Sequence, residues 1–148
     1  MFERIAINPG RPALDCHPDF IDVSLLYHFR VNLFADPQPR SFAVTWEEAA
    51  AALEALPRMI FEPDGSFVIT GDDDEGCRWQ VDGHLFDFAD RLHRVELHGE
   101  CPETEFDDLL RCVGWPAQAL VFEMIRTGET LAEAEFRRRA IFDFDSSR

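Results

Sequence analysis

The chain contains no lysine, so all 14 of its basic residues are arginine. This absence excludes Schiff-base chemistry, pyridoxal phosphate anchoring and the lysines that bind phosphate in P-loop proteins and kinases. The sequence also lacks a glycine-rich phosphate loop, a Gly-x-Ser-x-Gly motif and a His-Glu-x-x-His motif. It therefore predicts no catalytic residue and no cofactor-binding residue, and its motifs indicate no family.

Positive charge is scarce as well, because 29 acidic residues outnumber the 14 arginines and give a net charge of −15. Nucleic acids and anionic membranes are bound mainly through Lys and Arg, so neither is an expected partner. The one basic cluster, Arg137-Arg138-Arg139, is surrounded by acids: Glu133, Glu135, Asp143 and Asp145. An acidic surface attracts basic proteins, and a basic protein is the partner that the charge favours.

Cysteine is sparse and scattered, at Cys16, Cys77, Cys101 and Cys112, without a Cys-x-x-Cys motif. The first residues lack the run of about 7–15 apolar residues found in signal peptides. No stretch approaches the roughly 18–20 apolar residues of a membrane span. These observations predict a cytoplasmic protein with reduced thiols.

Hydrophobic residues are plentiful, at 46% of the 148 residues with 14 phenylalanines, so a core can form without a disulfide or metal. The length predicts a single globular domain over 1–148. Residues 1–19 are proline-rich and are expected to be an irregular lead-in. Residues 141–148 are expected to be a C-terminal tail whose alternating Ile141–Asp145 segment pairs at a sheet edge, in this chain or in a C2 homodimer.

Alternation of apolar and polar residues over Val23–Leu33 predicts a strand with its odd-numbered residues in the core. The region 59–98 reads as an antiparallel meander with turns at Asp64–Gly65 and Asp82–Gly83, since Asp-Gly favours tight turns. The second turn would separate strands at Cys77–Val81 and Leu85–Phe88. The remaining expected strands are Ser41–Thr45 and Leu92–His98.

Helix signals occur in three places. A capping box at Thr45–Glu48 predicts a helix over Trp46–Leu56, and Pro102 opens a helix over Glu103–Val113. A second capping box, Thr130–Glu133, predicts a helix to about Ala140, with Arg137–Arg139 near its C-terminus. Residues 117–126 fit either a strand or a helix, and a strand is slightly favoured. The whole pattern predicts an α+β fold, an antiparallel β-meander sheet of about five to seven strands with two or three helices packed on one face.

Two groups could hold a metal, and the sequence leaves metal binding undecided. The acidic run Asp72–Glu75 offers ligands to Ca²⁺, but its glycine arrives one position early for an EF-hand, so a solvated connector is favoured. His93, His98 and Cys101 could serve zinc. An offset of five places the two histidines on opposite faces of a strand, which argues against a shared metal unless a bulge intervenes.

The nucleophile candidates are weak. Ser24 and His28 share a face but lie about 13 Å apart along a strand. Cys16–His17 are neighbours in a proline-flanked loop, where nothing indicates a lowered thiol pKa. The acids between Glu100 and Asp108 suit a helix N-terminus, and the three tryptophans suit core positions, although an aromatic ligand box is an alternative.

The best functional hypothesis is a small acidic, non-catalytic module that binds or regulates another protein. One alternative is a metal-dependent hydrolase or isomerase that uses Asp72–Glu75, His84 and His98. Another is a small-molecule-binding domain that uses the cavity between sheet and helices.

Overall fold

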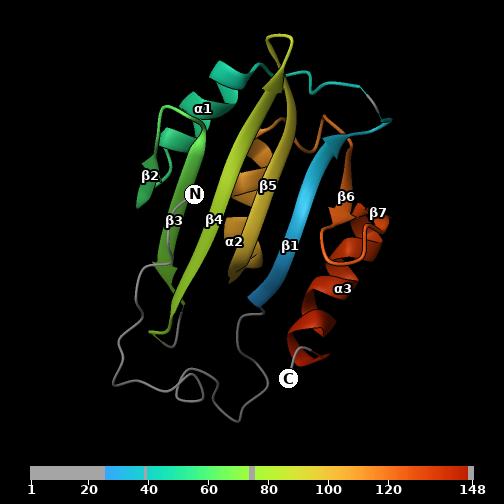
Figure 1. Ribbon diagram of the computed structural model, residues 1–148. Helices are drawn as coiled ribbons and strands as arrows, with labels where there is room; N and C mark the ends of the chain where they lie inside the picture. Colours follow the sequence, from blue (N-terminus) through green and yellow to red (C-terminus); the bar gives the residue numbers. More distant parts are fainter. Residues whose placement is uncertain (1–25, 39, 74–75, 147–148) are drawn as a thin grey trace.

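The computed structural model describes residues 26–38, 40–73 and 76–146, and these form seven strands and three helices (Figure 1). The elements are β1 (Leu26–Ala35), α1 (Trp46–Glu54), β2 (Met59–Phe61), β3 (Ser66–Asp72), β4 (Arg78–Phe88), β5 (Arg91–Pro102), α2 (Glu103–Cys112), β6 (Leu120–Met124), β7 (Thr130–Ala132) and α3 (Glu133–Ser146). All strands belong to one antiparallel sheet in the order β2-β3-β4-β5-β1-β6-β7. The α+β prediction is confirmed.

Strand β1 lies inside the sheet, between β5 and β6. Its odd-numbered residues are buried and its even-numbered residues are more exposed, as the alternation predicts. Leu33, for example, is 1% exposed and pairs with Val95 on one side and Phe122 on the other. The predicted residues Val23–Leu25 lie outside the described part of the chain.

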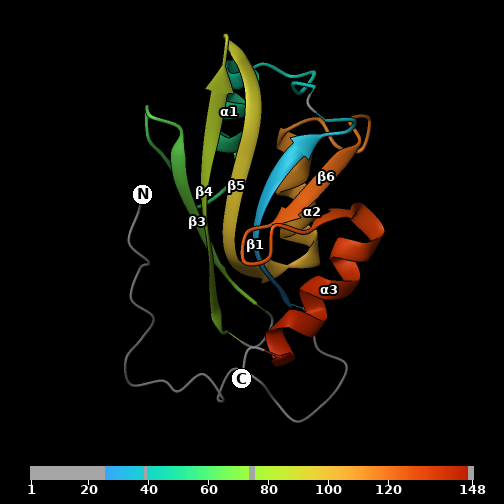
Figure 2. The ribbon, with the colours of Figure 1, turned by 45° about the vertical axis from the view of Figure 1, so that its right-hand side comes forward.

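The helices cover one face of the sheet, where a single hydrophobic core joins them (Figures 1 and 2). Phe106 of α2 lies 5.0 Å from Phe29 of β1 and 5.6 Å from Phe136 of α3, measured between ring centroids. Leu53 of α1 belongs to the same core and is 1% exposed. We call the opposite side of β1, β4 and β5 the polar face; it carries His28, Arg30, Asn32, Gln80, Asp82, His84, Arg94, Glu96, His98 and Glu100.

One of the two predicted Asp-Gly turns is confirmed. Asp64–Gly65 connects β2 to β3, with Gly65 at φ 95° and the Asp64 carboxylate accepting from the Ser66 backbone N–H at 2.9 Å. The turn at Asp82–Gly83 is wrong, because both residues lie within the continuous strand β4. A Cβ at Gly83 would lie 2.1 Å from the ring of Phe67, so glycine makes room there for a buried aromatic side chain.

The hairpin between β4 and β5 turns instead at Ala89 and Asp90, whose φ angles are 52° and 66°. Two positive φ values in a two-residue loop are the geometry of a type I′ turn. Glycine, which usually fills such a loop, is absent, so the local sequence carries no turn signal there.

The helix starts differ in how far they follow the local pattern. At α1 both hydrogen bonds of the Thr45–Glu48 capping box form, at 2.9 Å each. Helix α2 follows Pro102 as predicted, and β6 confirms the strand reading of residues 117–126. Residues 41–45 are irregular, so the short strand predicted there is wrong; Phe42 still donates its N–H to the carbonyl of Leu92 at 3.1 Å.

The helix start predicted at Thr130 is also wrong. Residues Thr130–Ala132 form β7, because they pair with β6 and bury Leu131. Helix α3 begins at Glu133 and continues to Ser146, so the three consecutive arginines lie in its first half. The edge strand predicted after Ala140 is therefore wrong, and the homodimer expectation loses the segment on which it rested.

The cysteines fall into two groups. Cys101 and Cys112 are free thiols in the core, and burial raises both pKa values, that of Cys112 to about 11. Cys77 is disulfide-bonded. The expectation of four reduced thiols is therefore wrong. Within the described chain, each helix is too short or too polar to cross a membrane.

Candidate functional site

The acidic segment begins within β3, which extends to Asp72, and continues as the connection to β4, as predicted. The carboxylate of Asp72 lies 3.4 Å from Arg58 and 3.5 Å from Arg78, and that of Asp73 accepts from the Cys77 N–H at 2.8 Å. Asp74 and Glu75 lie outside the described residues. The two described carboxylates are thus engaged by the protein's own groups.

His84 and His98, the other ligands of the hydrolase alternative, both lie on the polar face. His84 pairs with Glu96 across β4 and β5, and His98 pairs with Asp82. Over residues 26–38, 40–73 and 76–146, no cluster of three or more His, Cys, Asp and Glu side chains has the geometry of a metal site. The described residues therefore give the hydrolase alternative no support.

The predicted zinc group is spread over the sheet. A β-bulge in the β4–β5 ladder leaves His93 outside the pairing, and its ring packs on Phe34 of the polar side at 5.9 Å. The prediction that His93 and His98 face opposite sides is therefore wrong, because it assumed a regular strand. The offset of five positions between them still spans about 16 Å along a strand. Cys101 is fully buried on the helix-covered side of the sheet, so its side chain points away from both histidines.

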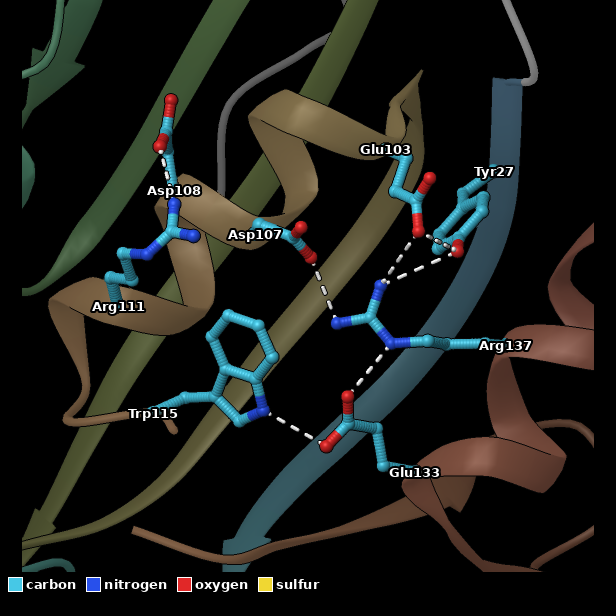
Figure 3. A network of polar contacts seen from close by, with 8 residues as sticks. All are labelled: Tyr27, Glu103, Asp107, Asp108, Arg111, Trp115, Glu133 and Arg137. Carbon is cyan, nitrogen blue, oxygen red and sulfur yellow. Dashed lines mark hydrogen bonds and ion pairs between the residues drawn. The ribbon is translucent and has the colours of Figure 1, made fainter. Parts of the chain in front are cut away.

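The acids of α2 have a partner that the sequence did not reveal, the guanidinium of Arg137 on α3 (Figure 3). Its Nη2 lies 2.8 Å from Asp107 and its Nε lies 2.9 Å from Glu133, while Nη1 lies 3.6 Å from Glu103. The Tyr27 hydroxyl of β1 accepts from Nη1 at 3.3 Å and donates to Glu103 at 3.1 Å. Three separate elements, β1, α2 and α3, thus contact the guanidinium of Arg137.

This network is a structural clamp. Burial alone would lower the pKa of Arg137, but hydrogen bonds to Tyr27, Asp107 and Glu133 raise it above its ordinary value. A guanidinium in that state is a permanent cation and cannot act as an acid or base. Trp115 extends the network by donating its Nε1–H to Glu133 at 2.9 Å.

Replacing Arg137 with methionine should destabilise the fold by about 2–3 kcal/mol, because three neighbouring carboxylates would lose their cation. Urea unfolding measures the change. The matched control is Arg138→Met, whose side chain is 66% exposed and pairs with Glu135; it should cost less than about 0.5 kcal/mol. Equal losses of unfolding free energy in the two variants would show that Arg137 stabilises the fold no more than an exposed ion pair does.

An acidic hollow of about 310 Å³ lies at the end of the sheet beside the β4–β5 hairpin. We call it the hairpin pocket, and it is lined by Trp46, Glu47, Pro63, Asp64, Asp87 and Asp90. Four of the six described lining residues are carboxylates, and none is an arginine. Two hydrogen bonds from Ser66 lower the pKa of the Asp64 carboxyl.

Phe88 stands next to the hairpin pocket in sequence and is 70% exposed, the highest exposure of a large apolar residue in the described chain. It lies between Asp87 and the Ala89–Asp90 loop. Non-glycine residues at positive φ cost of order 1 kcal/mol each, and such strain is frequent at binding sites. Neither the exposed aromatic ring nor the strained, acidic loop stabilises the fold.

A second pocket, of about 280 Å³, lies between the sheet and α2, and we call it the indole pocket. It is lined by Leu56, Pro57, Arg58, Ile69, Thr70, Gly71, Asp72, Trp79, Glu105 and Asp108. The indole of Trp79 is 4% exposed, and its Nε1 is buried without a hydrogen-bond partner in the described structure. The expected core role of Trp79 is confirmed, whereas its unpaired N–H was not foreseen.

The remaining candidates from the sequence contribute little to a site. Ser24, Cys16 and His17 lie outside the described residues. His28 belongs to the polar face, and the tryptophans do not form a common box, because Trp46 lines the hairpin pocket, Trp79 the indole pocket and Trp115 the Arg137 clamp.

The chain matches no protein-family model, and no curated protein or solved structure is significantly similar to it. Its function is therefore inferred from its own geometry.

Proposed function

We propose that this protein is a non-catalytic binding module that docks a basic segment of a partner protein at the β4–β5 hairpin. The observation that carries the proposal is that one hairpin presents exposed Phe88 on the side of His93, 5.9 Å away between ring centroids, and the four carboxylates of the hairpin pocket on the side of α1. Interfaces commonly centre on an aromatic anchor that fits a pocket of the partner. Phe88 provides such an anchor, and the acidic pocket provides the charge selectivity.

The chemistry of the pocket favours an arginine or lysine side chain as its occupant. The carboxylates of Asp64, Asp87 and Asp90 would accept hydrogen bonds from a guanidinium or ammonium group. The indole of Trp46 forms part of the wall and would attract the same cation through its ring face. The net charge of −15 would speed the approach of a basic partner.

Selection of random displayed peptides on the protein tests the proposal. Enriched peptides should carry Arg or Lys next to an apolar residue, and their affinity should fall as salt increases. Either Phe88→Ala or the pair Asp87→Asn and Asp90→Asn should weaken binding at least about tenfold, as loss of a central contact does.

The matched control is the pair Asp36→Asn and Glu54→Gln, which removes the same charge from exposed sites outside the pocket. Peptides selected on the wild-type protein should bind this control within about twofold. Enrichment of neutral or acidic peptides, or equal losses in both pairs, would overturn the proposal.

A further inference from the structure

A row of aromatic rings crosses the polar face at the end of the β4–β5 hairpin. The ring of His93 lies 5.9 Å from that of Phe34 on β1 and 5.9 Å from that of Phe88 on β4, measured between ring centroids. Phe34 and His93 are partly exposed, and Phe88 is 70% exposed. We call these three residues the aromatic row. The helices of the described chain pack on the other face of the sheet, so the row is open to a partner (Figure 2).

Arg94 is held beside the aromatic row by two contacts. Its guanidinium carbon lies 3.8 Å from the ring centroid of Phe86, and its Nη1 donates to Oδ1 of Asn32 at 3.0 Å. Asn32 is fixed in turn, because its Nδ2 donates to Glu123 at 2.8 Å. A guanidinium has five N–H donors, so Arg94 retains donors for the carbonyl groups of a bound chain.

The spacing of the aromatic row matches that of a polyproline II helix. Phe34 and Phe88 belong to the two strands that flank β5, and two strand spacings amount to about 9.6 Å. One turn of polyproline II contains three residues and rises about 9.3 Å, so prolines three positions apart lie on the same side at nearly this distance. The carbonyl groups of polyproline II form no internal hydrogen bonds, which leaves them able to accept from Arg94.

The aromatic row and the hairpin pocket lie on opposite faces of the same hairpin. Asp87 lines the pocket, and the next residue, Phe88, belongs to the row. The hairpin extends beyond the neighbouring strands (Figures 1 and 2), so one bound segment can pass around its end from one face to the other. The cation of Arg94 repels a basic side chain from the row, whereas the four carboxylates of the pocket attract it. A basic residue of the segment therefore belongs at its pocket end.

From these observations we propose that the partner segment is a proline-rich polyproline II helix with an arginine or lysine near one end. This inference rests on the proposed function, because the basic residue occupies the hairpin pocket. Two prolines three positions apart pack on Phe34 and Phe88, with His93 between them, and Arg94 donates to a carbonyl of the segment. Because polyproline II is largely formed before binding, its ordering costs little conformational entropy.

Fluorescence anisotropy with labelled synthetic peptides and the full chain tests the inference. Each peptide contains a Pro-Ala-Ala-Pro core with one arginine placed one, two or three positions before or after it. In the match of each peptide, both prolines are replaced by alanine. At least one proline peptide should bind at least about tenfold more tightly than its match, as expected for a central contact. Equal affinity within every pair would overturn the inference.

Variants then test which residues produce the preference for proline. Phe34→Ala should weaken binding of the best proline peptide at least about fivefold and leave its alanine match within about twofold, because the arginine contacts lie in the hairpin pocket. The matched control is Ile60→Ala, which removes a 50% exposed apolar side chain from β2, at the edge of the sheet beyond β3. It should leave both affinities within about twofold. An unchanged preference for proline in Phe34→Ala would overturn the assignment to the aromatic row.

Thermal unfolding shows whether Phe34→Ala remains folded, and Phe34→Leu is a second variant that keeps an apolar side chain but lacks the ring. The peptide pairs on the wild-type protein decide the inference without any variant. If proline and alanine peptides bind equally and both depend on Asp87 and Asp90, the inference is wrong and the proposed function stands. If no peptide of the set binds while display-selected basic peptides do, the inference alone is again wrong.

Discussion

Leu33→Ala should lower the free energy of unfolding by about 2–5 kcal/mol, the usual range for a large-to-small change in a core. Leu33 is 1% exposed at the centre of the sheet, where it pairs with Val95 and Phe122. The change would leave a cavity between β1 and the helices that the paired strands cannot close. Denaturant unfolding measures the loss.

The matched comparison lies on the same strand. Arg30 is exposed on the polar face, so Arg30→Ala should change stability by less than about 0.5 kcal/mol. Similar losses at Leu33 and Arg30 would mean that β1 is buried on both faces, and the one-sided core would then be wrong.

Gly99→Ala should be at least as damaging, at about 3–5 kcal/mol, because steric overlap and backbone strain add. Gly99 has a φ of 142° in the middle of β5, and a Cβ there would lie 2.2 Å from the backbone carbonyl oxygen of Gln80. A side-chain end could move aside, but a carbonyl oxygen in the ladder of β4 cannot. Thermal and urea unfolding of the variant measure the loss.

Gly128→Ala separates the two contributions. Gly128 also has a positive φ, of 76°, but an added Cβ would meet nothing within 4 Å. Only the conformational cost, of about 1 kcal/mol, should remain. If Gly99→Ala cost no more than Gly128→Ala, the close contact with Gln80 would have little energetic weight.

The local sequence correctly predicted those strands and helices whose pattern lies entirely within their own residues. The alternation of β1 gave the buried face correctly, because a strand inside a one-sided sheet places every second residue in the core. The start of α1 was equally clear, since the Thr45–Glu48 capping box is complete within four residues.

The errors arose where a distant residue decides the conformation. Asp82–Gly83 has the composition of a turn, but Gly83 stays in β4 because the ring of Phe67 occupies the space beside it. Thr130 resembles a helix cap, but β6 lies alongside and pairs with it. Neither neighbour is visible in the local sequence.

The two pockets could be predicted only in part. Acidic residues at 87 and 90 are evident in the sequence, but their proximity to Asp64 requires the pairing of β3, β4 and β5. The cavity between sheet and helices was expected, yet its lining comes from the end of α1, from β3 and β4, and from α2. Trp79 looked like an ordinary core residue, because an unpaired N–H depends on all the surrounding atoms.

The position of β1 between β5 and β6 has a consequence for how the chain folds during its synthesis. Strands β2 to β5 follow one another in sequence and can pair as soon as they leave the ribosome. β1 can complete its pairing only when β6 emerges, since the side chains of Asn32 and Glu123, 91 positions apart, form one of the bonds that join these strands. Distant pairing slows folding, and the open edge of β1 is meanwhile available to other chains. Expression temperature and chain concentration should therefore influence the yield of folded protein strongly.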